Sequence, residues 1–429
     1  MHFHTVTLVL MSLASIPASA ESSSSPSYPE CALSCKQQVL TDYKPSCADT
    51  DTSCLCADTH YQTIFADCVS ADCTTRESLT AKYVGSRECD IPIVRRYPEV
   101  DAATLVPFII ATILFGIRIA AKAMCLGGGW GPDDVTICIA YALAIIIFSL
   151  NTSMVHYGFG MNTWDIYPLD NITKAMKRFY AFVLCYKALI SLAKISVCLF
   201  LLRIFQSTVF RYTTYTMIAV NAAIAIAWIF ADVFHCMPIH LAWTGWEGEE
   251  QGKCIDFVTS TFVNGYVNIV VDSVMVTMPV YEVLKLNLSF QKKMGVALMF
   301  AGGLVLTIIG IVRVIVFSRN DSNANPLYEM EALNHWSVIE CQIAIVCACL
   351  PTTRAMLVRF FPSVLGLSTE QALPYTNAGS SRGGANGSRQ VGEKSQISKR
   401  VSYAVDYGTK QKRDSGKFIQ LVEVGADKS

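Results

Sequence analysis

The sequence predicts an all-α membrane protein: a seven-transmembrane helix bundle preceded by a small, disulfide-rich, helical extracellular domain. Three observations predict it. The 429-residue chain is 52% hydrophobic and 16% charged, whereas about a quarter of the residues in soluble domains are charged. Seven apolar segments are each long enough to cross a bilayer. Eight of the 17 cysteines fall between Cys31 and Cys89, behind a leader typical of secretion.

The leader occupies residues 1–20, MHFHTVTLVLMSLASIPASA, and has the organisation of a signal peptide. An apolar core precedes the small-residue end Ala18-Ser19-Ala20, and this core is too short to span a membrane. The segment departs from the usual pattern because His2 and His4, and no Lys or Arg, precede the core. We expect cleavage after Ala20, which makes residues 21–98 an extracellular domain with its linkers.

Cysteines are the main feature of this extracellular domain. An even set of cysteines in a short exported chain predicts four disulfides, because cross-links replace the hydrophobic core that so small a domain cannot build. A zinc site is the alternative, but the pairs lack C-x2-C spacing and an exported domain meets oxidising conditions. The eight are Cys31, Cys35, Cys47, Cys54, Cys56, Cys68, Cys73 and Cys89.

Residues 99–360 hold the predicted membrane helices, and residues 361–429 form a polar tail. In lipid, helices satisfy their own backbone hydrogen bonds, so apolar runs of this length predict helices. The tail lacks hydrophobic periodicity and is predicted to be disordered. The seven segments are 102–123, 134–154, 179–205, 213–235, 258–283, 294–318 and 333–357.

Orientation follows from the leader and from the basic residues. An exported N-terminus and seven crossings place the C-terminus in the cytoplasm, in a multi-pass protein that we expect in the plasma membrane. The predicted inner loops carry more Lys and Arg than the outer ones, in agreement with this orientation. Two outer sequons, at Asn171 and Asn320, predict N-glycosylation.

Six ionisable residues of the predicted helices are candidates to face the interior of the bundle, where charge is costly and usually functional. On the third helix Lys187, Ser191, Lys194 and Cys198 recur at helical spacing, which predicts one polar stripe. We expect the cations to pair with the acids around an outward-facing cavity that binds a ligand; the alternative is an ion network that only fixes helix packing. The six are Lys187, Lys194, Asp232, Asp272, Arg313 and Glu340.

Two further features concern loops. Cys236 and Cys254 fall in the second outer loop, and a disulfide between them would stabilise the fold by roughly 3 kcal/mol. Trp243 and Trp246 lie between them, either rimming the cavity or serving as interface anchors. In the first inner loop, Asp133-Asp134 are expected to cap the second helix, since carboxylates favour a helix N-terminus.

The cysteine spacing resembles the CFEM domain, a fungal extracellular eight-cysteine module. Pro29-Glu30-Cys31-Ala32 and Asp51-x2-Cys54-x-Cys56 carry the resemblance. It implies that Asp51 is a candidate axial ligand for the ferric iron of haem, with apolar flanks from Leu55, Tyr61, Ile64 and Phe65. The alternative is that Asp51 caps a helix beside the disulfides.

Residues 100–360 resemble the fungal rhodopsin-like integral membrane domain, and the fusion to CFEM resembles the CFEM-containing G-protein-coupled-receptor-like family. This resemblance implies a cell-surface receptor-like protein involved in surface sensing or host infection. The matching motifs are Gly127–Asp134, Lys194-Ile195-Ser196, Leu201–Phe205, Cys236-x-Pro238, Trp243, Cys254, Asp272, Pro279, Arg313, Trp336–Glu340 and Cys349-Leu350-Pro351.

Several motifs are absent. Residues 333–357 contain no lysine, so no retinal Schiff base is expected there. The acidic-Arg-Tyr and Asn-Pro-x-x-Tyr switch motifs of animal receptors are missing, which leaves coupling to a G protein open. No catalytic motif is present, so we expect no enzyme.

Three functions are therefore considered. The leading one is a receptor whose extracellular ligand shifts a helix equilibrium that a cytoplasmic signalling protein reads. The second is a haem- or iron-binding surface protein, and the third is a transporter that uses the buried charges. Membrane lipid is a further expected partner, and the net charge of zero gives no indication of nucleic-acid binding.

Overall fold

The computed structural model describes residues 26–43, 51–124, 129–285, 290–319 and 325–360. The expected signal peptide, Cys47, Asn320 and the polar tail lie outside these ranges. Within them the chain is almost entirely helical, and its two strands form one short antiparallel pair. The predicted fold class is confirmed.

Four short helices form the N-terminal domain, which we call the head (residues 26–98): α2 (Glu30–Tyr43), α3 (Thr52–Ala57), α4 (Thr59–Asp72) and α5 (Thr75–Glu88). Polar side chains cap the N-termini of three of these helices. Asp51 and Asp58 accept backbone N–H groups at the starts of α3 and α4, and Thr74 does so at α5. Capping of this kind fixes helix ends that a small core cannot hold.

Disulfides cross-link the head. Cys31 bonds to Cys73, Cys35 to Cys68 and Cys56 to Cys89. Cys54 is also disulfide-bonded. The apolar core beside them is small, with Ala32, Cys35, Val69 and Ala81 in one cluster and Val39, Leu55 and Tyr61 in another. Cross-links therefore supply much of what holds this domain together.

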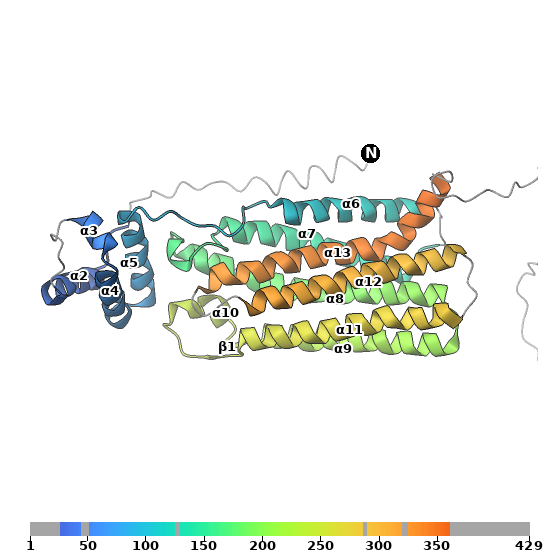
Figure 1. Cartoon of the computed structure of the whole chain (residues 1–429). Helices are drawn as coiled ribbons and strands as arrows, with labels where there is room; N and C mark the ends of the chain where they lie inside the picture. Colours follow the sequence, from blue (N-terminus) through green and yellow to red (C-terminus); the bar gives the residue numbers. More distant parts are fainter. Residues whose placement is uncertain (1–25, 44–50, 125–128, 286–289, 320–324, 361–429) are drawn as a thin grey trace, which may run out of the picture. The chain divides into compact units, whose positions relative to one another are not determined.

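Seven long helices follow and run side by side (Figure 1). All seven are long and apolar enough to cross a membrane. We call the end where α6 begins the head end of the bundle, and the opposite end the tail end. In chain order the helices are α6 (Ala102–Ala123), α7 (Pro132–His156), α8 (Asp170–Ile204), α9 (Thr208–Val233), α11 (Phe257–Lys285), α12 (Phe290–Ser318) and α13 (Pro326–Phe360).

Helices α8 and α13 begin nine and seven residues earlier than the hydrophobic pattern predicts. Their first turns contain charged residues such as Asp170, Lys174 and Glu329, which hydropathy assigns to a loop. A helix satisfies its backbone wherever it extends, so its polar turns continue beyond the apolar stretch. The hydrophobic pattern therefore located the membrane segments correctly but underestimated the lengths of helices α8 and α13.

Helix α13 is central to the bundle. In its most apolar stretch 72% of the residues are buried, against 17% in α6 and in α9. It packs with α7 and α8 through small side chains such as Ala140, Ala144 and Ala344, which let helices approach closely. Near its C-terminal end α13 bends (Figure 1), where Pro351 removes a backbone donor.

The connection between α9 and α11 forms a structured loop, residues 234–256, which we call the disulfide loop. Strand β1 (Cys236–Met237) pairs antiparallel with β2 (Lys253–Cys254), and Cys236 and Cys254 form the expected disulfide. A short helix, α10 (Leu241–Thr244), and a 3-10 turn, η2 (Gly245–Glu247), lie between the strands. A second 3-10 turn, η1 (Thr163–Asp165), lies between α7 and α8.

Candidate functional site

A cavity of about 300 Å³ opens at the head end of the bundle. The N-terminal part of α8 between Met176 and Val183, the end of α9, the start of α11 and the disulfide loop surround it, together with Met330 of α13. Its lining is mostly aromatic and aliphatic, including Phe179, Tyr180 and Phe257, while Asp232 and His235 supply polar groups. An apolar hollow of this size with few polar groups is typical of a small-molecule site.

A smaller cavity of about 30 Å³ lies next to it. The two share Phe179, Val183 and Phe257 in their linings. The smaller one is the more polar, because Arg313 and Asn334 line it. The head end thus combines an apolar chamber with an adjoining polar recess.

The six ionisable residues predicted for the ligand pocket form three ion pairs. Lys187 pairs with Asp232, Lys194 Nζ lies 2.9 Å from Asp272 Oδ1, and Arg313 Nη1 lies 3.4 Å from Glu340 Oε2. All six side chains are at least four-fifths buried. Charges at such depth are tolerated when they are paired, and they are expected near functional sites.

The three pairs lie at different depths. Lys187 and Arg313 line the small head-end cavity, and Asp232 lines the large one. Lys194, Asp272 and Glu340 instead line a separate, deeper cavity of about 70 Å³, whose other walls are apolar. The six residues are thus buried and paired, but they line three separate cavities and not the single pocket that the sequence predicted.

Two uncharged residues complete these pairs and were not predicted. The Tyr186 hydroxyl donates to Glu340 Oε2 at 2.9 Å and accepts from Arg313 Nη1. Lys194 Nζ donates to Asn268 Oδ1 at 2.9 Å. A buried Tyr or Asn has no charge to mark it in an apolar helix, although Tyr186 directly precedes Lys187 in the sequence.

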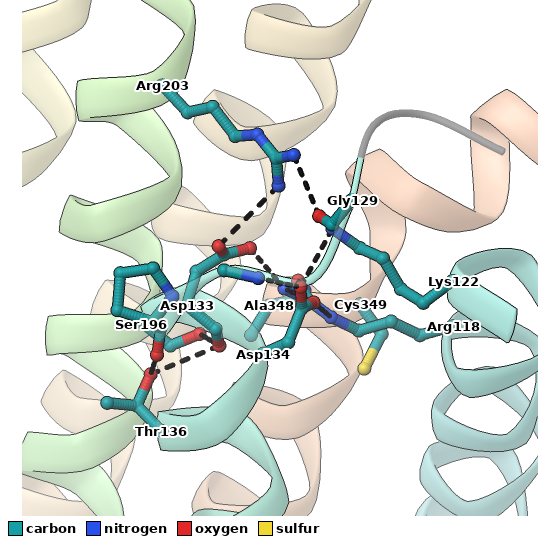
Figure 2. A network of polar contacts seen from close by, with 12 residues as sticks. Arg118, Lys122, Gly129, Asp133, Asp134, Thr136, Ser196, Arg203, Ala348 and Cys349 are labelled. Atoms are coloured by element: carbon teal, nitrogen blue, oxygen red, sulfur yellow. Dashed lines mark hydrogen bonds and ion pairs between the residues drawn. The ribbon is translucent and has the colours of Figure 1, made fainter. Parts of the chain in front are cut away.

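A second charged cluster lies at the tail end, where α6, α7, α8 and α13 meet (Figure 2). Arg118 is 1% exposed and is its centre. Its Nη2 lies 2.7 Å from Asp133 Oδ2 and 2.9 Å from Asp134 Oδ1, and its Nη1 donates to the Ala348 carbonyl of α13 at 2.6 Å. One guanidinium therefore joins three helices.

Lys122 and Arg203 complete this tail-end cluster (Figure 2). Lys122 Nζ lies 2.8 Å from Asp134 Oδ2. Arg203, at the end of α8, is only partly buried, with Nη1 3.8 Å from Asp133 Oδ1 and Nη2 2.8 Å from the Gly129 carbonyl. The cluster thus contains three cations and two carboxylates, and Arg203 is its most accessible member.

The predicted capping role of Asp134 is correct, because its Oδ2 accepts the Gly131 N–H at 3.0 Å. The ion pairs of Asp133 and Asp134 were not predicted. Arg118 and Lys122 were counted among the basic residues of the inner side, where such residues usually face water. Only the packing of four helices reveals that these two are buried.

Asp51, the candidate haem ligand, caps α3. It accepts hydrogen bonds from the Ser53 hydroxyl at 2.7 Å and from the Cys54 N–H at 3.1 Å. These bonds hold the pKa of the exposed Asp51 carboxyl below its usual value. Of the expected apolar flanks, Leu55 and Tyr61 are buried in the head's own core. The capping alternative therefore describes what Asp51 does in this structure.

The glycosylation candidate Asn171 lies in the first turn of α8, and its Oδ1 accepts from Lys174 Nζ at 3.4 Å. Trp246 of the disulfide loop donates through its ring N–H to the Thr173 hydroxyl of the same sequon at 2.9 Å. The sequon threonine thus also helps to hold the disulfide loop against α8.

Helix α5 of the head contacts the head-end loops of the bundle. Arg76 Nη2 lies 2.6 Å from Asp170 Oδ1 and 3.2 Å from Glu247 Oε1. Arg87 Nη2 lies 3.0 Å from Asp165 Oδ1, a carboxylate that is almost fully buried. The disulfide loop, which borders the large cavity, is therefore also bonded to the head.

These features define the class of protein: a multi-pass helical membrane protein with a cross-linked N-terminal head and a cavity at the head end of its bundle. Residues 117–359 match the fungal rhodopsin domain, and residues 24–90 match the CFEM domain. The chain belongs to the fungal rhodopsin domain family and carries a CFEM head, as the sequence motifs predicted.

Curated relatives agree with this assignment. The chain is 28% identical over 209 residues to an SAT4 family membrane protein of Emericella nidulans, covering 48% of this chain and 52% of the relative. It is 27% identical to the polyenoic acids biosynthesis gene cluster protein Ba17b of Metarhizium anisopliae, covering 42% and 51%. The chain thus spans about half the length of these two relatives.

The chain matches receptor GIN3 of Arthrobotrys oligospora over a longer stretch. The two are 23% identical over 308 residues, which cover 70% of this chain and 71% of the relative. No solved structure matches the chain. The family match and the seven helices long enough to span a membrane make it a multi-pass membrane protein.

Proposed function

We propose that this protein is a cell-surface receptor that binds an extracellular small molecule in its head-end cavity. The observation that carries the proposal is the 300 Å³ cavity, which is bordered by the disulfide loop and adjoins buried ion pairs. In this proposal the CFEM head lies outside the plasma membrane and the tail end faces the cytoplasm. The similarity to receptor GIN3 supports a sensing role.

In this proposal, a shift of α8 transmits the effect of ligand binding to the cytoplasmic end of the bundle. This helix carries Lys187 and Lys194 beside the cavities and ends at Arg203 in the tail-end cluster. A ligand that binds one arrangement of α8 better than another shifts the population of the two. Arg203, partly exposed and weakly paired, would then change its contacts where a cytoplasmic signalling protein can read them.

Filling the cavity tests this proposal. Val183 lines both head-end cavities, whereas Val270 is 63% exposed on the outer surface of α11. In a fungal strain that lacks the gene, we expect Val270→Trp to restore the transcriptional response to extracellular cues and Val183→Trp to leave it lost. Surface labelling of the head confirms that both variants are exported. A normal response from an exported Val183→Trp protein would refute the receptor proposal.

A second candidate function is binding of ferric haem by the head. A hollow of about 320 Å³ lined by Val39, Tyr43 and Ile64 favours it, although Asp51 is not among its lining residues. The Asp51 carboxyl is exposed, and hydrogen bonds hold its pKa below the usual value. A carboxylate is a hard oxygen ligand suited to ferric iron. In this candidate Asp51 would exchange its capping bonds for the metal.

Two substitutions separate capping from haem ligation. Asn caps a helix about as well as Asp but offers no anionic ligand. In a haem titration of the full chain, we expect Asp51→Asn to lose a Soret shift that the native protein shows, without a loss of head stability. Asp51→Ala should lose the Soret shift and also about 1 kcal/mol of stability. An unchanged shift in Asp51→Asn would remove Asp51 as the ligand.

A further inference from the structure

Two deeply buried polar atoms in the small head-end cavity have no hydrogen-bond partner within the part of the chain that the structure describes. Arg313 uses Nη1 for Tyr186 and Glu340, but among the described residues its Nε has no hydrogen-bond acceptor. Asn334 donates through Nδ2 to Asn151 at 2.6 Å and to Glu331 at 3.2 Å, while its Oδ1 accepts no bond from the described residues. Leaving such buried groups unpaired is costly, so each position calls for a partner.

The unpaired atoms lie where a ligand can reach them. Arg313 is 3% exposed and Asn334 is 1% exposed, and both line the 30 Å³ recess. That volume is enough for one small polar group. Because the recess and the 300 Å³ chamber share Phe179, Val183 and Phe257, a molecule in the chamber can place one end in the recess.

The two cations that line the recess are already paired. Glu340 neutralises Arg313, and Asp232 neutralises Lys187. An ionised ligand group would therefore bring an uncompensated charge into a buried site, which is strongly unfavourable. What the recess offers is one free donor, the Arg313 Nε–H, and one free acceptor, Asn334 Oδ1.

We propose that the head-end cavity binds a small apolar molecule that ends in a neutral hydroxyl or primary amide. The oxygen of this group accepts from Arg313 Nε, its hydrogen is donated to Asn334 Oδ1, and the apolar body lies in the chamber against Phe179 and Phe257. This inference rests on the proposed receptor function and adds the chemical class of the ligand.

Four eight-carbon probes test the class on the full chain in lipid nanodiscs: octan-1-ol, octanamide, octyl methyl ether and octanoate. Binding is measured by titration calorimetry, with the signal of empty nanodiscs subtracted to remove partition into lipid. We expect saturable binding of the alcohol and the amide. The ether can accept but not donate, and octanoate is charged, so both should bind at least tenfold more weakly.

Two variants locate the site. Arg313→Lys keeps the positive charge for Glu340 but removes the Nε donor, and should weaken octan-1-ol and octanamide about tenfold. Arg178→Lys is the matched control, since Arg178 lines neither head-end cavity. Val183→Trp fills the junction of the two cavities and leaves the residues of the ion pairs unchanged in sequence. It should abolish binding of all four probes even if Arg313→Lys fails to fold.

The proposal is overturned if octanoate or the ether binds as tightly as the alcohol, if an intact Arg313→Lys protein binds normally, or if no probe binds above the lipid background. The last result would mean that only water satisfies the two atoms. Failure here is distinct from failure of the receptor proposal. If Val183→Trp abolishes the cellular response but neutral probes do not bind, the receptor stands and the ligand class is wrong.

Discussion

At the scale of single residues, the interactions whose loss is expected to cost the most stability are those of buried charged side chains. Arg118 is held by two carboxylates and a backbone carbonyl, so its desolvation is offset by three partners. Arg203 faces one of the same carboxylates at a longer distance and is partly exposed. A buried ion pair adds little net stability over apolar packing, but removal of one partner leaves the other charged and unpaired.

Arg118→Met is therefore expected to lower stability strongly, by about 3–5 kcal/mol, because Asp133 and Asp134 would remain buried with too little positive charge. Arg203→Met should cost less than about 1 kcal/mol, since the lost pair is long and partly solvated. Thermal unfolding of both proteins in the same detergent compares them. Equal losses would contradict the assignment of Arg118 as the centre of the cluster.

At the scale of elements, the disulfide loop connects several parts of the head end. Its two strands are cross-linked, it borders the large cavity, and it bonds to α8 through Trp246 and to α5 through Glu247. His235 precedes the first strand and packs edge-on against Phe257. Burial lowers the pKa of His235 below its usual 6.5, although Asp232 opposes this shift and Lys187 adds to it.

This shift predicts that acid loosens the disulfide loop. A lowered histidine pKa means that the unfolded loop binds protons more readily, so the contribution of His235 to stability is complete above pH 6.5 and declines as the pH falls below it. Hydrogen exchange of residues 236–254 between pH 7.5 and 5.5, corrected for intrinsic rates, measures the effect. His235→Gln should show no such trend, and a persisting trend would assign it to another group.

At the scale of the whole molecule, ion pairs connect the head with the helix bundle. Arg76 and Arg87 of α5 meet acids on three segments of the head end: the η1 turn, the start of α8 and the disulfide loop. Exposed pairs of this kind contribute little each. The pair of Arg87 with the buried Asp165 is expected to contribute the most.

Charge reversal tests this coupling. Arg87→Glu places a like charge against Asp165 and should increase hydrogen exchange in α5 and in residues 163–170. Adding Asp165→Arg should restore part of the protection, with a coupling energy of about 0.5–3 kcal/mol. Arg95→Glu is a control on the exposed pair with Glu99, where a small effect is expected. Additive effects of the Arg87 and Asp165 changes would show that the two sites are independent.

The sequence by itself determined the seven helices, the cross-linked head, the family and six of the buried ionisable residues. These properties depend on local quantities: hydropathy over about 20 residues, helical periodicity and cysteine spacing. The same local reading found that Asp134 caps its helix.

Only the tertiary structure determined the partners of each buried charged residue. Arg313 and Tyr186 are 127 positions apart, and Arg118 reaches a carbonyl 230 positions away. No local pattern relates such residues, because their distance depends on how seven helices pack. The same packing buried Arg118 and Lys122 and divided one expected pocket among three cavities. It also left Arg313 Nε and Asn334 Oδ1 without a hydrogen-bond partner among the described residues.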